Sequence, residues 1–159
     1  MSSTMFSGGA GVTEPPDPEV VVEAYAAPEI TTEAGRYLRA VARDEVPPRR
    51  SVADDDARRL WEIAFGLAAR RRFAERAPLA EISRTVAAAV HEHPTLCLPM
   101  LDAEMLLRAA LGEEVPVDEI DPDVVVAVYV LLFRAIADEL ALGEDELGGL
   151  IVQAEKTAF

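Results

Sequence analysis

The stretch DPDVVVAVYVLLF, residues 121–133, decides the fold of this chain. Its apolar part, residues 124–133, is too short to span a membrane and is typical of an element buried in a protein core. The residues before it are those that begin a helix. Asp121 suits the N-cap, Pro122 the first helical position and Asp123 the negatively charged first turn.

A strand is the alternative for residues 124–133, because the valines are β-branched and suit a buried sheet. We favour a helix, since the apolar pattern continues beyond the stretch through Ile136 and Leu140. Gly143 follows and is expected to stop the helix as its C′ residue. The prediction is one long, buried helix.

Prolines and cap residues divide the rest of the chain into further helices. We expect five further helices. The first starts at Thr31 or Thr32 and stops before Pro47, the second runs from Ser51, paired with Asp54 in a capping box, to about Ala77, and the third carries Ile82 to Val90. The fourth runs from a cap at Asp102 to Gly112, and the fifth carries Leu147 to Ala154. Aromatic residues are only 6% of the chain, which favours closely packed helices over a sheet. The sequence predicts an all-α fold, a compact bundle of about six helices with orthogonal or mixed packing.

The chain of 159 residues is long enough for one domain. We expect a disordered N-terminal lead-in over 1–16, which is rich in glycine and ends in paired prolines, and a single helical domain over 17–159. A short helix is expected over 18–27, whose start resembles that of the helix at 121. The single cysteine, Cys97, excludes an internal disulfide and fits the reducing cytoplasm, and no secretory signal or membrane span is expected.

Charge is unevenly distributed along the sequence. Residues 36–84 hold 12 of the 15 basic residues with 8 acids, whereas residues 85–159 hold 15 acids and only 3 basic residues. Residues 1–35 add six acids, and the net charge is −14. A GC-rich genome or adaptation to salt would also produce such a composition. If it reflects function instead, the acidic half is suited to a basic protein partner.

We therefore predict a non-enzymatic, acidic, helical interaction protein, such as an inhibitor, an immunity-type protein or an assembly factor. The acids expected to bind the basic partner are Glu113, Glu114, Asp118, Glu119, Glu139, Glu144 and Glu146. The arginines expected to serve internal docking, or self-association into a homo-oligomer, are Arg58, Arg59, Arg70, Arg71, Arg72 and Arg76.

Two alternatives belong to other functional classes. A transcriptional regulator would bind DNA through the Arg-rich helix, but a net charge of −14 repels nucleic acid and no second recognition helix follows. A metal- or thiol-dependent enzyme would use His91, His93 and Cys97, but two histidines two residues apart point roughly 200° from each other on a helix. The simpler interpretation is a helix C-terminus at His91 and a Cys97 buried between two leucines. We expect no enzyme activity, no bound metal and no cofactor.

Overall fold

Helices account for the regular structure of the chain. The computed structural model describes residues 29–50, 53–74 and 76–159, and in these ranges it forms six α-helices, two short 3-10 helices and no strand. The helices are α2 (Glu33–Ala42), α3 (Asp55–Arg72), α4 (Leu79–Glu92), η2 (Pro94–Leu96), α5 (Met100–Ala110), η3 (Val117–Glu119), α6 (Pro122–Glu139) and α7 (Glu144–Ala158). The predicted all-α bundle is confirmed. The expected lead-in at 1–16 and the short helix at 18–27 lie outside the described residues.

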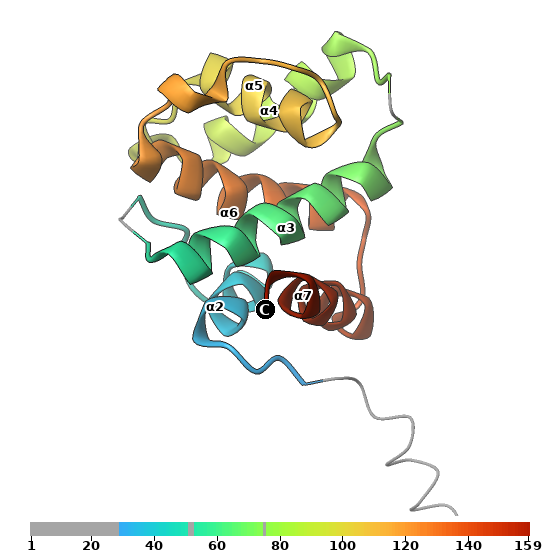
Figure 1. Cartoon of the computed structure of the whole chain (residues 1–159). Coiled ribbons are helices and arrows are strands. Elements are labelled where there is room, and N and C mark those ends of the chain that lie inside the picture. Colours follow the sequence, from blue (N-terminus) through green and yellow to red (C-terminus); the bar gives the residue numbers. More distant parts are fainter. Residues whose placement is uncertain (1–28, 51–52, 75) are drawn as a thin grey trace, which may run out of the picture.

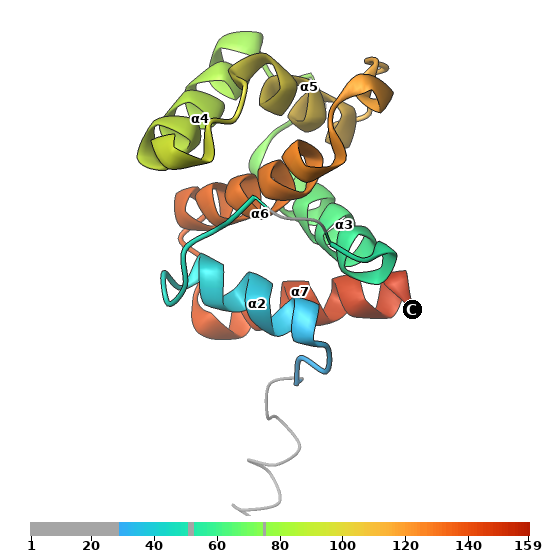
Figure 2. The same cartoon turned by 90° about the vertical axis from the view of Figure 1, so that its left-hand side faces the viewer.

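The helices are arranged in three layers (Figures 1 and 2). α4 and α5 form one outer layer, α3 and α6 lie in the middle, and α2 and α7 form the other outer layer. In Figure 1, α3 runs across the page while α7 points along the line of view, so these layers cross steeply. α7 packs on α3 rather than on α6, which precedes it in the chain. No described helix has both the length and the apolar character needed to cross a bilayer.

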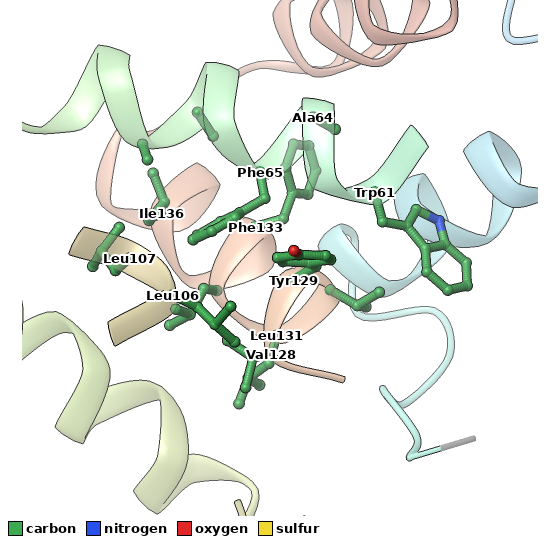
Figure 3. Packing of buried hydrophobic residues seen from close by; sticks show 14 of the residues in the cluster. Trp61, Ala64, Phe65, Leu106, Leu107, Val128, Tyr129, Leu131, Phe133 and Ile136 are labelled. Carbon is green, nitrogen blue, oxygen red and sulfur yellow. The ribbon is translucent and has the colours of Figure 1, made fainter. Parts of the chain in front are cut away.

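α6 forms the centre of the core, and the strand alternative for residues 124–133 is wrong. Every residue from Val124 to Phe133 is buried within this helix. The middle layer receives side chains from both outer layers, which is why one helix can be apolar on all sides. Figure 3 shows Phe65 of α3 against Tyr129 of α6, with ring centroids 5.5 Å apart, and Leu107 of α5 approaching the same cluster.

Side-chain capping bonds mark where α2 and α3 begin. The Thr32 hydroxyl accepts a hydrogen bond from the Gly35 N–H of α2, at 2.9 Å, and the Asp54 carboxylate accepts one from the Ala57 N–H of α3, at 2.7 Å. Asp121 occupies the N-cap position of α6 as predicted, although its side chain makes no capping hydrogen bond.

Three predicted boundaries are wrong. α3 begins after Asp54 rather than after Ser51, which lies outside the described residues, and it ends at Arg72 rather than near Ala77. It ends there because Phe73 adopts an extended conformation that buries its ring in the core. α5 begins at Met100, so Asp102 lies in the first turn instead of capping it.

Helix C-termini contradict a further expectation, that Gly143 stops α6. Ala141 takes the left-handed conformation instead, with a φ of 52°, and Gly143 is the N-cap of α7. The N–H groups of Ala141 and Leu142 bond to the carbonyls of Asp138 and Ala137, which is a Schellman motif. α2 ends in the same way with Asp44 in the left-handed conformation, and α5 ends with Gly112 there, as predicted.

Candidate functional site

Several acids that were expected to bind a partner are paired within the protein. Glu144, in the first turn of α7, receives hydrogen bonds from two arginines of the α2 layer, Arg39 at 2.6 Å and Arg43 at 2.9 Å. These bonds lower the pKa of Glu144, and the bond from Arg43 has the largest effect. Glu146 accepts a bond from the Gly143 N–H at 3.1 Å and lies 3.9 Å from Arg71. Both glutamates therefore hold α7 in place.

Two more of the predicted acids are engaged in the same way. Glu139, at the end of α6, accepts a bond from Arg72 Nε at 2.8 Å and one from the buried Thr85 hydroxyl at 3.0 Å. Glu113 is bonded to Arg108, which lowers the pKa of Glu113. The remaining three are exposed on the connection from α5 to α6 and form no ion pair with the described residues: Glu114, Asp118 and Glu119. Four of the seven predicted acids are thus paired within the protein, and three are not.

The arginines of α3 also make contacts inside the protein. Arg59 donates to the Ala158 carbonyl at 3.1 Å, and Arg70 donates to the Ala110 carbonyl at 3.4 Å. Arg72 lies between Glu139 and Glu81. These contacts join α3 to both outer layers. Two arginines, Arg58 and Arg76, are exposed and make no ion pair within the described part of the chain.

His91, His93 and Cys97 are not brought together as a metal site. His93 Nε2 lies 2.7 Å from an Nη atom of Arg134, whose guanidinium also reaches Glu92 and Asp44. Cys97 is exposed rather than buried, because its left-handed backbone, with a φ of 51°, turns the thiol outward between the buried Leu96 and Leu98. In the ranges that the structure describes, no three His, Cys, Asp or Glu side chains are placed to hold a metal ion.

A groove between α2 and the start of α3 is the feature that the sequence analysis missed. It has a volume of about 660 Å³. Its floor comes from three helices, with Tyr37 of α2, Trp61 of α3, and Val126 and Val130 of α6. Trp61 and the two valines are almost fully buried, so the groove exposes an edge of the core.

Aromatic rings form one wall of this groove. The Tyr37 and Trp61 rings have centroids 5.5 Å apart, and the Trp61 indole N–H donates to the Ala34 carbonyl at 3.0 Å, which fixes the indole ring. In Figure 3 the Trp61 ring lies on the α2 side of α3, apart from Phe65 and Tyr129. Burial raises the pKa of Tyr37, and the charge of Arg49 partly opposes this rise.

Charged residues line the mouth of the groove. Three exposed carboxylates contribute, from Glu33, Asp54 and Asp56, against a single basic residue, Arg49. The Arg49 guanidinium carbon lies 5.2 Å from the Tyr37 ring centroid, a cation–π contact. The groove is therefore apolar at its floor and negative at its edge.

The neighbouring arginine shows how differently these two cations are held. Arg50 donates to Asp123 at 2.8 Å and to the carbonyls of Leu96 and Cys97, each at 3.2 Å. Arg49 forms no ion pair with any described residue and contacts the protein through the Tyr37 ring. Arg50 thus fastens the connection between α2 and α3, while the Arg49 guanidinium has no carboxylate or carbonyl partner of this kind among the described residues.

Comparisons of the chain with protein-family models, with curated proteins and with solved structures give no significant match.

Proposed function

We propose that this protein is a non-enzymatic, cytoplasmic interaction protein that binds a basic segment of another protein in the groove between α2 and α3. The observation that carries the proposal is the combination of an apolar aromatic floor and a carboxylate-lined mouth in one groove of about 660 Å³. The proposal keeps the basic partner predicted from the sequence but assigns it to different acids. Four of the acids first considered already serve internal contacts.

The chemistry of the groove favours a segment that carries both cationic and apolar side chains. Carboxylates steer a cationic chain toward the mouth, and burial of the chain's own apolar side chains against Tyr37 and the groove floor then stabilises the complex. A groove of this size accepts a few side chains, so we expect an affinity on the order of micromolar for a short peptide.

Other partners fit the charge of the groove less well. Nucleic acid would bring phosphates toward Glu33, Asp54 and Asp56. A second copy of the chain also carries a net charge of −14, so long-range repulsion opposes self-association. We therefore leave DNA binding and a homo-oligomer out of the proposal.

Trp61 provides a direct test, because it is the only tryptophan in the chain and lies in the groove. The protein is titrated with a short peptide of alternating arginine and leucine, and its tryptophan fluorescence is recorded at low and high salt. We expect saturable binding that weakens as salt screens the carboxylates. A peptide with glutamate in place of arginine should not bind. If the arginine–leucine peptide leaves the fluorescence unchanged at low salt, and calorimetry detects no binding, the proposal is wrong.

Variants locate the binding surface. Glu33→Gln and Asp56→Asn each remove one charge from the groove and should weaken binding by about two- to fivefold, as expected for an exposed ion pair. Asp118→Asn and Glu119→Gln remove the same charge from the α5–α6 connection and serve as matched controls. A loss confined to the controls would assign the partner to that connection and contradict the groove.

A further inference from the structure

Arg49 occupies the place in the groove where a cation of the partner would gain the most binding free energy. Its guanidinium carbon lies 5.2 Å from the centroid of the Tyr37 ring, which also packs against the Trp61 ring. A guanidinium prefers the face of an aromatic ring because the ring is electron-rich there. The same groove is lined by Glu33 and Asp56, which would attract an incoming cation to this ring.

The contact of Arg49 is one that can be exchanged. Arg49 is exposed and has no ion pair with a described residue, whereas Arg50 is held by a carboxylate and two carbonyls. The backbone is therefore fixed at position 50, and the side chain at position 49 can leave the ring without disturbing that anchor. Its departure would uncover the Tyr37 face and keep the groove walls in place.

We infer that Arg49 is an internal competitor for the partner, and that the groove selects an arginine side chain that replaces the Arg49 guanidinium on Tyr37. This inference rests on the proposed function and names its specificity. Arginine is preferred over lysine because a planar guanidinium stacks flat on the ring, whereas an ammonium is compact and strongly hydrated. Each binding event then exchanges one cation–π contact for another. This exchange lowers the affinity for the partner and makes the groove selective for arginine.

Removal of Arg49 tests the competition. Arg49→Ala should bind the arginine–leucine peptide about two- to fivefold more tightly than the unaltered chain, the range expected for one exposed cation–π contact. Loss of a positive charge alone also favours a cationic peptide, so Arg84→Ala is the matched control. Arg84 is exposed on α4, in the opposite outer layer, and the substitution changes the net charge equally. The gain for Arg49→Ala must exceed that for Arg84→Ala.

Substitution of the ring tests the specificity. Tyr37→Leu keeps an apolar wall but removes the aromatic face, so it should abolish the preference for the arginine–leucine peptide over a lysine–leucine peptide. In the Tyr37→Leu background, Arg49→Ala should increase the affinity for the arginine–leucine peptide no more than Arg84→Ala does, because Arg49 no longer makes a cation–π contact with an aromatic ring at position 37. Thermal unfolding of each variant checks that the fold is kept.

The outcomes separate the two proposals. Binding by the unaltered chain with equal or weaker binding by Arg49→Ala overturns the competition and leaves the proposed function in place. An equal affinity for arginine and lysine peptides overturns the specificity alone. Binding by Arg49→Ala and not by the unaltered chain would mean that Arg49 blocks the groove, which contradicts the proposed function of the unaltered chain and the exchange that rests on it. If neither chain binds either peptide, the proposed function fails, and the inference fails with it.

Discussion

The Thr32 hydroxyl donates a hydrogen bond to the carboxylate of Glu155, across 123 residues of sequence. The backbone N–H of Thr32 reaches the same carboxylate at 2.9 Å, and that of Thr31 reaches it at 3.2 Å. A carboxylate of α7 thus holds the N-terminus of α2, where unpaired N–H groups and the helix dipole both favour negative charge. Burial alone would raise the pKa of Glu155, but the hydrogen bonds from Thr32 and Thr31 outweigh it and the pKa is lowered.

Glu155→Gln should destabilise the protein by about 2 kcal/mol at neutral pH, since hydrogen bonds to a charged acceptor are lost. A folded-state pKa below the ordinary value of 4.5 means that this contribution is present above that pH. It disappears as the pH falls through the folded-state pKa. Urea unfolding of both chains over a pH series should therefore show two stabilities that converge in acid. Glu114→Gln, at an exposed position, is the control. If Glu155→Gln is as stable as the unaltered protein at neutral pH, the hydrogen bonds of Glu155 to Thr31 and Thr32 do not stabilise the fold.

Gly35→Ala should also destabilise the protein, although alanine normally strengthens a helix by about 1 kcal/mol over glycine. An added Cβ would lie 2.6 Å from Ile30 Cγ2 and 2.7 Å from Glu155 Oε2, so the Glu155 carboxylate would have to move away from the N-terminus of α2. Gly148→Ala in α7 is the matched comparison, because nothing lies within 4 Å of its added Cβ. Thermal unfolding should show a lower Tm for the first variant and a higher Tm for the second.

Ala141→Gly should stabilise the protein by about 1 kcal/mol, because Ala141 holds a φ of 52° that costs an L-residue about 1–2 kcal/mol and glycine far less. The same change at Ala88, exposed within α4, should cost up to about 1 kcal/mol. Chemical denaturation of both variants checks the opposite signs. A loss at Ala141 would mean that the Schellman motif does not set the end of α6.

Alkaline pH should destabilise the fold through Tyr129. Burial, followed by the nearby charge of Glu62, raises the pKa of Tyr129 to about 12 from an ordinary value of 10.0. The neutral phenol is favoured in the folded state, so its contribution is complete below pH 10 and is lost as the pH rises toward 12. Tyr129→Phe should remove most of this decline and the latest step in the phenolate absorbance titration. An unchanged titration would show that another tyrosine ionises last.

The helices could be predicted from sequence because their signals are local. Asp121 and Pro122 begin α6, and the apolar pattern that follows continues to Leu140, which is longer than a strand of ordinary length. Two helix ends could not be predicted, because Asp44 and Ala141 adopt the left-handed conformation that glycine usually supplies. Their backbone hydrogen bonds compensate for this cost, and a single sequence does not reveal them.

The candidate site could not be predicted from the sequence, because it is made by residues that are far apart in the chain. Tyr37, Trp61 and Val126 lie on three helices that the sequence predicts, but nothing local indicates that they meet at one groove. Likewise, Glu144 looked like a free surface acid, and its partner Arg39 lies 105 residues away.

The outer layer of α2 and α7 has a consequence for biosynthesis. α2 precedes every other described helix in the chain, yet it packs on α7, the last of the described helices. Until α7 emerges, one face of α3 and the N-terminus of α2 lack their partners in a nascent chain. We expect the growing polypeptide to resist proteolysis only once the segment around Glu155 has cleared the exit tunnel.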